Sequence, residues 1–241
     1  PNDADLSNNE VSWSIRARGI LEDFESYADF ATDLTPWISK DVDGLPIISL
    51  TMTSSDGQED PLSFPGYDSP KGFFIYNPAS TTPTSTNVKY MTPPNGKKYV
   101  ISFAVTEGAN KVNDWLISPV YQLGENPSFR FFAASYSGNV RCNILVSTGG
   151  TEVSDFTVLP NGSGITMKED WNEYSFDLSN YANQNVRLAV QVVYNDLLFM
   201  LDDVEVYANS GLGIEENNAQ IAENIAYVSG GKLMLNYKSA R

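Results

Sequence analysis

The stretch NEYSFDLSNYANQNVRLAVQVVY, residues 172–194, decides the fold class. Apolar and polar residues alternate from Tyr174 to Leu178 in its first half, and again from Val186 to Val192 in its second half. Successive side chains of a strand point to opposite faces, so this alternation predicts two strands that each have one face in a core and one in solvent. The polar SNYANQN between them is typical of a turn.

Other parts of the chain extend the same pattern. Apolar, β-branched and aromatic runs separated by Gly, Pro, Asn and Asp occur at 46–52, 72–78, 98–105, 114–123, 128–135, 140–148 and 199–208. Helical patterns are scarce: the best candidate is the short segment 218–226, and a turn of helix is also possible within 21–30. Closely spaced strands without intervening helices predict an all-β fold, a jelly-roll β-sandwich of two antiparallel sheets. The polar segments 51–70 and 77–97 are expected to be long surface loops.

Composition excludes several classes of function. The chain has 241 residues, a formal net charge of −15, no histidine and one cysteine. Such a charge disfavours nucleic acid and anionic membranes as partners, and the lack of histidine excludes a Ser-His-Asp triad and His-ligated metals. Cys142 shares strand parity with Val140 and Ile144, which predicts a buried, inert thiol. No apolar run reaches the roughly 20 residues of a membrane span.

The chain divides into three parts by composition. Residues 1–10 are polar and are expected to form a tether, 11–208 form the jelly-roll domain, and 209–241 form a linker followed by a small hairpin around Gly230-Gly231. Because the sequence starts at Pro1, we expect a segment upstream. Abundant Asn, Asp, Ser, Thr and Gly with few lysines suit a secreted or cell-surface bacterial protein.

Acidic residues gather in three places. They are Glu22, Asp23, Glu25 and Asp29, then Asp41 and Asp43 in DVDG, and finally Asp202, Asp203 and Glu205. Both faces of the last strand are apolar, so at least one of Asp202 and Asp203 should be buried and need a cation. Arg187 is the only basic residue between Lys168 and Lys232. Because Ca²⁺ takes oxygen ligands, the pattern predicts a structural calcium ion; the alternative is that these acids are simply solvated.

Four motifs in this order resemble the cleaved-adhesin, or choice-of-anchor J, domains, which are distantly similar to MAM domains. They are Phe24-Glu25, the series Trp37, Asp41, Asp43 and Gly44, then NDWLISPVYQL at 113–123, and FMLDDVEVY at 199–207. The resemblance covers residues 20–208 and implies a jelly roll with structural calcium and a role in adhesion. It implies Glu25, Asp41, Asp43 and one of Asp202 and Asp203 as ligands. The Leu45-Pro46-Ile47 that follows departs from the family pattern, and the tail resembles the start of a C-terminal sorting region.

The favoured function is a non-catalytic adhesion module that binds a host glycan or extracellular protein. Aromatic rings in loops would form its binding surface, and the candidates are Tyr67, Phe73, Tyr76 and Tyr136. For Phe73 and its neighbour Phe74, core packing is the competing interpretation. Tyr67, between Gly66 and Asp68, is the better surface candidate.

Two other functions fit the same composition. A glycoside hydrolase needs two carboxylates and no histidine, and its pair would come from Asp56, Glu59, Asp60, Asp155 and Asp170. No spacing selects a pair among these residues. The other possibility is a structural or targeting module of a larger surface protein that binds no specific ligand.

Overall fold

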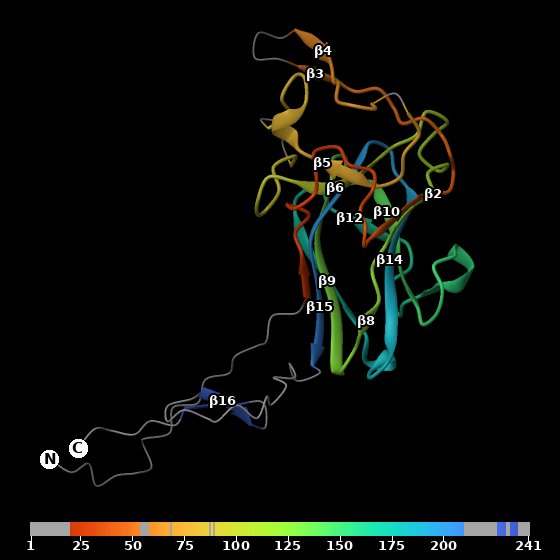
Figure 1. The fold of residues 1–241 in the computed structure, drawn as a ribbon. Helices are drawn as coiled ribbons and strands as arrows, with labels where there is room; N and C mark the ends of the chain where they lie inside the picture. The colour runs from red at the N-terminus through yellow and green to blue at the C-terminus, as the bar shows by residue number, and fades with distance from the viewer. Residues whose placement is uncertain are drawn as a thin grey trace, which may run out of the picture.

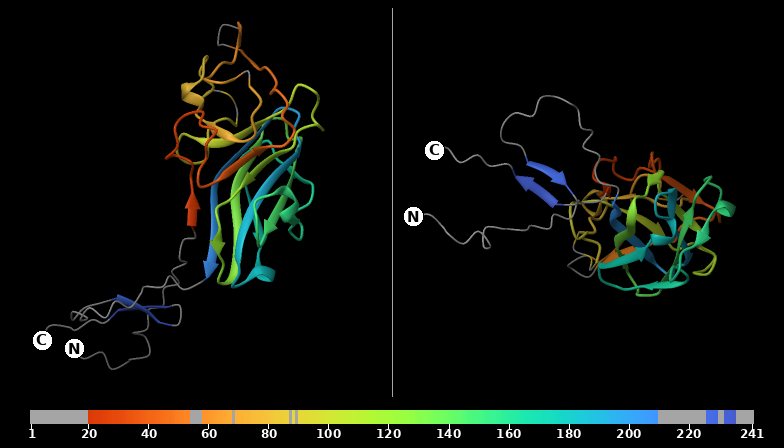
Figure 2. Two further views of the ribbon diagram at one scale, coloured as in Figure 1. Left: turned by 45° about the vertical axis from the view of Figure 1, so that its right-hand side comes forward. Right: turned by 90° about the horizontal axis from the view of Figure 1, so that it is seen from below.

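The computed structural model describes residues 20–53, 58–67, 69–86, 88, 90–209, 226–229 and 232–235. Two large antiparallel sheets make up most of this part, and Figures 1 and 2 show them packed face to face. The predicted all-β sandwich is therefore confirmed, while its jelly-roll connectivity stays a prediction. The predicted tether at 1–10 and most of the helical segment 218–226 lie outside the described residues.

The first sheet, sheet A, contains six strands. Its order is β13 (Asn172–Asp177), β9 (Glu125–Ser135), β15 (Leu198–Asn209), β6 (Tyr99–Phe103) and β5 (Phe74–Tyr76), with β1 (Ile20–Glu22) paired to β15. The first and last strands of the body thus lie side by side, with Ile20 opposite Val206.

The second sheet, sheet B, contains seven strands. Its order is β11 (Thr157–Val158), β10 (Val140–Ser147), β14 (Asn185–Tyr194), β7 (Asp114–Ile117) and β2 (Ile38–Asp41). Two short strands lie off this path, β12 (Ile165–Met167) beside β10 and β8 (Tyr121–Gln122) beside β14.

The main core lies between the two sheets and follows the alternation of the sequence. Val186, Leu188, Val190 and Val192 are buried in it, whereas Arg187 and Gln191 on the opposite face of β14 are partly exposed. Cys142 is a free, fully buried thiol in the same core, as predicted. Burial raises the pKa of this thiol well above its usual value, because the thiolate would lose its hydration.

Sheet A is buried on its outer face as well. Part of the chain between β2 and β6 folds over that face, and Figure 1 shows these orange and yellow segments gathered at one end of the sandwich. Leu62, Phe64 and Met91 from this region pack with Phe74 and Phe103. The expectation that 51–70 and 77–97 are only surface loops is therefore wrong, because their apolar side chains complete a second core.

Short elements complete the described chain. A small hairpin joins β3 (Thr51–Thr53) to β4 (Glu59–Pro61), and the predicted tail hairpin is present as β16 (Ala226–Ser229) paired with β17 (Lys232–Leu235). The helices here are single 3₁₀ turns, η2 (Pro78–Ser80), η3 (Val153–Asp155) and η4 (Ser179–Tyr181). Within the described residues, no helix has the length and apolarity to cross a membrane.

Candidate calcium and ligand sites

Three carboxylates meet where β2 ends against β7. Each of Asp41, Asp43 and Asp114 offers an oxygen, and these three oxygens lie within 4.8 Å of one another. Asp41 ends β2 and lies opposite Asp114 of β7. The DVDG turn then returns Asp43 to the same place, because Gly44 adopts a φ of 65° that permits the tight turn. We call this group the Asp114 site.

The turn orients its carboxylates through backbone donors. Gly44 N donates to Asp41 Oδ1 at 2.7 Å, and Leu45 N donates to Asp43 Oδ1 at 2.9 Å. Asn113 N donates to Asp43 Oδ2 at 2.6 Å, which ties the turn to the start of β7. The carboxylate positions are therefore set by the local fold.

Asp114 is the most constrained member of the Asp114 site. Asp114 is 1% exposed, and Ser102 Oγ of β6 donates a hydrogen bond to its Oδ2 at 2.7 Å. Loss of hydration raises the pKa of Asp114 well above its usual range, and the nearby charges of Asp43 and Asp41 raise it further. In the described part of the chain no Lys or Arg forms an ion pair with these three acids. A divalent cation with oxygen ligands would satisfy this set of donors.

A second acidic group lies in sheet A. Asp202 and Asp203 occupy a β-bulge of β15, where the pairing with β9 shifts, and Asp203 has a φ of 48°. Asn95 Nδ2 donates to Asp203 Oδ2, and Lys97 N and Lys98 N both donate to Glu25 Oε1. The loop before β6 therefore holds Glu25 and Asp203 close to Asp202. We call Glu25, Asp202 and Asp203 the Asp202 site.

Burial also dominates the electrostatics of the Asp202 site. Asp202 is 1% exposed, and burial raises its pKa to about 9, with further increases from the charges of Asp203, Glu25 and Asp23. The hydroxyl of Tyr99, also fully buried, has no hydrogen-bond partner among the described residues. Burial raises the pKa of Tyr99 well above its usual value, and the charges of Tyr76 and Asp202 add to it. In the register of β15 and β6, Leu201 lies opposite Val100, so Asp202 and Tyr99 are the next residues along the two strands. An orphaned oxygen beside buried acids fits a site for a cation.

The structure divides the five calcium ligands predicted from the sequence. Asp41 and Asp43 belong to the Asp114 site in sheet B, whereas Glu25, Asp202 and Asp203 group together at sheet A. Among the described residues, Glu25, Asp202 and Asp203 are not part of the cluster of three converging carboxylates. The predicted ligands therefore form two groups, because Asp43 is tied to the start of β7 and the loop before β6 holds Glu25 and Asp203.

Asp114 was absent from the predicted ligands. It lies in NDWLI, and all four residues of β7 are buried. An acidic residue at the start of an otherwise apolar strand is the signal that could have identified it.

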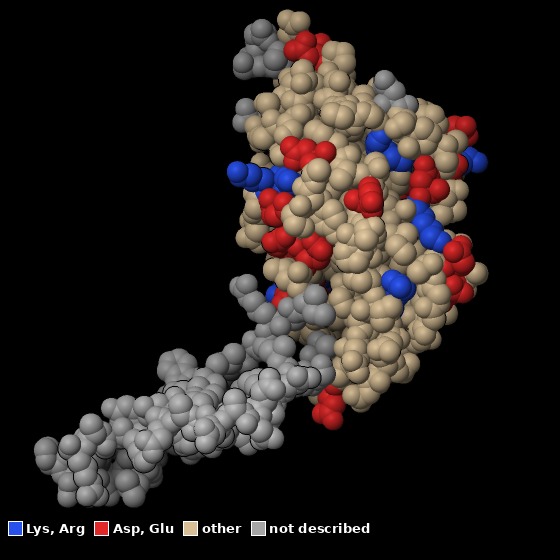
Figure 3. All heavy atoms as spheres, in the orientation of Figure 1, with Lys and Arg blue, Asp and Glu red and all other residues tan. Residues whose placement is uncertain are grey.

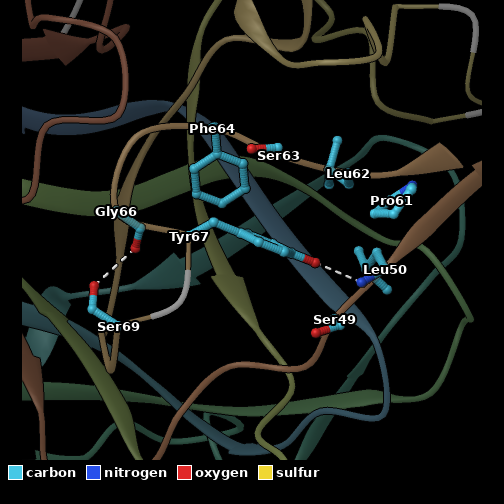
Figure 4. Close-up of a pocket in the computed structure, with 9 residues that line it drawn as sticks. All are labelled: Ser49, Leu50, Pro61, Leu62, Ser63, Phe64, Gly66, Tyr67 and Ser69. Atoms are coloured by element: carbon cyan, nitrogen blue, oxygen red, sulfur yellow. Dashed lines mark hydrogen bonds between the residues drawn. The ribbon is translucent and has the colours of Figure 1, made fainter.

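A hollow with aromatic and hydroxyl groups lies beside the β3–β4 hairpin. Its volume is about 580 Å³, and Figure 4 shows the residues that line it: Ser49, Leu50, Pro61, Leu62, Ser63, Phe64, Gly66, Tyr67 and Ser69. The Tyr67 ring crosses this view, and its hydroxyl accepts a hydrogen bond from Leu50 N at 2.5 Å. The same hydroxyl donates to Ile48 O at 3.3 Å, so the ring is held in place. We call this feature the Tyr67 hollow.

The four aromatic residues predicted to bind a ligand have different surroundings. Tyr67 is half-buried and lines the hollow, and Tyr136 is 38% exposed after β9. Phe73 and Tyr76 are wrong as ligand-binding candidates, because they are 1% and 0% exposed. Phe73, just before β5, lies in the main core and Tyr76 of β5 lies in the second core, since both faces of this strand are covered.

Two of the carboxylates that could serve a hydrolase accept local hydrogen bonds from the backbone. Asp155 Oδ2 accepts from Glu152 N, and Asp170 Oδ1 accepts from Trp171 N. Glu59 and Asp60 lie in β4, and Asp56 is outside the described residues. None of these four described residues belongs to the cluster of three converging carboxylates.

Comparison with known proteins identifies structures that share this fold. No family model and no curated protein matches the sequence. The K1 cleaved adhesin domain of Lys-gingipain from Porphyromonas gingivalis W83 matches the structure with a TM-score of 0.51 at 19% identity, over 80% of this chain and 99% of that domain. The K2 domain of Lys-gingipain matches with a TM-score of 0.50 at 21% identity, over 78% of this chain and 97% of that domain. The resemblance seen in the motifs is confirmed at the level of the fold: over about 80% of its length, this chain has the fold of the cleaved adhesin domains of Lys-gingipain.

Proposed function

We propose that this chain is a non-catalytic adhesion module, secreted or displayed on a bacterial cell surface, that binds a glycan or an extracellular protein of the host. The Tyr67 hollow is the observation that carries the proposal. It combines the half-buried ring of Tyr67, which rests on the buried Phe64, with the hydroxyls of Ser49, Ser63 and Ser69. Aromatic faces pack against the C–H faces of sugars, and fixed polar groups orient their hydroxyls. The fold shared with cleaved adhesin domains supports the same function.

The hollow is suited to recognition because its base is rigid. Phe64 lies 5.0 Å from Phe30 and 4.8 Å from Tyr67 between ring centroids, and it also packs on Phe74. Tyr67 is fixed at its other end by the backbone of residues 48 and 50. Little side-chain entropy remains to be lost when a ligand binds to such a surface.

We also propose that calcium stabilises the domain. The Asp114 site supplies carboxylates from Asp41, Asp43 and Asp114, and the Asp202 site supplies Glu25, Asp202 and Asp203. Each site contains one carboxylate that is 1% exposed. When bound, Ca²⁺ would neutralise these buried charges and join segments that are distant in sequence. Figure 3 shows other acidic groups spread over one face of the molecule.

Binding through the hollow can be tested by filling it. Ser49 is exposed at its rim, so Ser49→Trp places a large ring in the cavity without removing core packing. A screen of immobilised neutral glycans and extracellular matrix proteins should find a ligand for the wild-type chain and lose it with this variant. Val120→Trp is the matched control, because Val120 is exposed and does not line the hollow. Equal binding by wild type and Ser49→Trp would contradict the proposal.

A further inference from the structure

The outer face of sheet B differs from the rest of this acidic protein. Side chains of β2, β7, β10 and β14 that point away from the main core include Lys40, Arg141 and Arg187 but no Asp or Glu. The only acids in these four strands, Asp41 and Asp114, belong to the Asp114 site. Lys40 forms an ion pair with Glu152, next to η3, at 3.2 Å. Arg141 and Arg187 form no ion pair within the described residues, so they supply the positive charge of this face in a chain with twice as many acidic as basic residues.

Only part of this face is covered. In one row across the sheet, Leu145, Ala189 and Ile117 are buried beneath Phe156, which follows η3. Figure 1 shows β10 and β14 side by side, with the loop that carries η3 projecting next to them. The neighbouring row contains Asn143 and Gln191, which are partly exposed. The same row contains Trp115, which packs on Phe156, so the cover reaches Trp115 and leaves the two amides partly exposed.

Three amides form a continuous chain of hydrogen bonds across the uncovered part. Asn143 Nδ2 donates to Gln191 Oε1 at 3.0 Å, and Gln191 Nε2 donates to Asn113 Oδ1 at 2.9 Å. We call Asn143, Gln191 and Asn113 the amide row. It joins β10, β14 and the residue before β7.

Hydrogen-bond donors at the two ends of the amide row fix the orientation of its side-chain amides. Trp115 Nε1 donates to Asn113 Oδ1 at 2.9 Å, and Gly164 N donates to Asn143 Oδ1 at 2.8 Å. An indole N–H and a backbone N–H cannot accept, so both amide oxygens must face them. The second N–H groups of Asn143 and Gln191, and both N–H groups of Asn113, have no partner in the described structure. The row therefore presents several donors and recognises acceptor oxygens.

Arg141 adds a charge at the end of the amide row. It is exposed, lies opposite Tyr194 and places its guanidinium 4.4 Å from the centre of that ring. In the described chain it forms no ion pair, whereas Arg130 on sheet A is bonded to both Glu205 and Glu173. The nearby Asp196 accepts hydrogen bonds from Ser137 and Asn139. Arg141 is therefore available to an external anion.

We propose that this surface, formed by the amide row with Arg141 and Tyr194, binds an anionic glycan that bears uronate or sulfate groups. The charge of Arg141 and the N–H donors of the amide row complement carboxylate, sulfate and hydroxyl oxygens. Protein interfaces are built around a desolvated apolar centre, and the amide row has none, which favours a glycan over an acidic peptide. The surface shares no residue with the Tyr67 hollow, so the two assignments are independent.

Direct binding to oligogalacturonate and to chondroitin sulfate tests the proposal. The full chain should bind at least one of them by titration calorimetry, and added salt should weaken binding because it screens the charges. Arg141→Gln should reduce affinity about tenfold, the loss expected for one charge-assisted hydrogen bond. Gln191→Ala should also weaken binding, since it interrupts the amide row. Lys97→Gln, which removes one exposed charge outside sheet B, is the matched control and should bind normally.

Several outcomes would overturn this assignment. The surface is wrong if neither anionic glycan binds, or if Arg141→Gln and Gln191→Ala bind as well as Lys97→Gln. The ligand class is wrong if poly-glutamate, or a neutral galactan, binds more tightly than both anionic glycans in an Arg141-dependent way. Ser49→Trp should retain anionic glycan binding, so failure of the Tyr67 hollow and failure of this surface are distinguishable. Melting temperatures of all variants establish that each one folds.

Discussion

Asp41 and Asp114 lie directly opposite each other in the register of β2 and β7, and both contribute to one cluster of three carboxylates. Buried like charges this close are unfavourable without a counter-ion. The pairing therefore links the energetics of the sandwich to cation binding.

Calcium should raise the melting temperature of the wild-type chain. A ligand at 100 times its Kd stabilises the state to which it binds by about 2.7 kcal/mol, which corresponds to about 5–10 °C for a domain of this size. Asp114→Asn should reduce this increase, because it removes the buried ligand of the Asp114 site. Glu125→Gln, an exposed acid at the start of β9, is the control. The Asp114 site is not a calcium site if both variants respond to calcium and EDTA as the wild type does.

The metal-free protein should become less stable as pH rises from 5 to 8. The folded-state pKa is raised to about 9 for Asp202 and in the same direction for Asp114. Between the unfolded pKa and the raised folded pKa, the folded state holds more protons than the unfolded state, so its stability falls with increasing pH. Thermal unfolding in EDTA should show this slope, and Asp202→Asn should make it shallower. A melting temperature that rises with pH in EDTA would contradict the prediction.

Gly96→Ala should damage the Asp202 site. Gly96 has a φ of 67°, and an added Cβ would overlap the carboxylate of Glu25. Gly164→Ala is the matched control, since Gly164 has a φ of 58° but nothing within 4 Å of an added Cβ. Both variants incur the cost of a left-handed alanine, about 1 kcal/mol, but only Gly96→Ala should also weaken calcium-dependent stabilisation. Calcium titrations monitored by melting temperature distinguish the two effects, and equal responses would show that Glu25 does not bind the ion.

Phe64→Ala should strongly destabilise the domain. Phe64 is 6% exposed and packs on five other rings at one end of the sandwich. Loss of a buried phenyl ring costs about 3–5 kcal/mol, which urea unfolding will measure. Tyr136→Ala, at a residue that is 38% exposed, should change the free energy of unfolding by less than about 0.5 kcal/mol. Similar losses for the two variants would mean that the cluster does not form a second core.

Tyr67→Phe should separate the ring of Tyr67 from its hydroxyl. The variant loses the hydrogen bonds to Leu50 N and Ile48 O, at a cost of about 1 kcal/mol or 2–4 °C in melting temperature. Binding to a ligand of the Tyr67 hollow should weaken, because the ring is no longer held in place. Tyr136→Phe, which removes a hydroxyl from an exposed tyrosine, is the control for stability. Unchanged stability in Tyr67→Phe would show that the hydroxyl does not fix the ring.

Strand parity predicted the sheets well but failed at the β-bulge of β15. Simple alternation places Met200, Val204 and Val206 on one face. In the structure Leu201, Val204 and Val206 share the main core, and Met200 lies in the second core on the outer face of sheet A. The extra residue of the bulge at Asp202–Asp203 shifts the alternation by one. Nothing in a local pattern marks this shift, because both faces of this strand are apolar.

The sequence by itself determined the all-β class, most of the strands, the inert Cys142 and the presence of acidic motifs, since alternation and residue chemistry are local properties. Only the tertiary structure decided which acids meet. Pairing of β2 with β7 added Asp114 to Asp41 and Asp43, and the loop before β6 placed Glu25 with Asp202 and Asp203. The coverage of β5 on both faces likewise made Phe73 and Tyr76 core residues. These outcomes depend on contacts between segments far apart in the chain, which residue spacing alone does not specify.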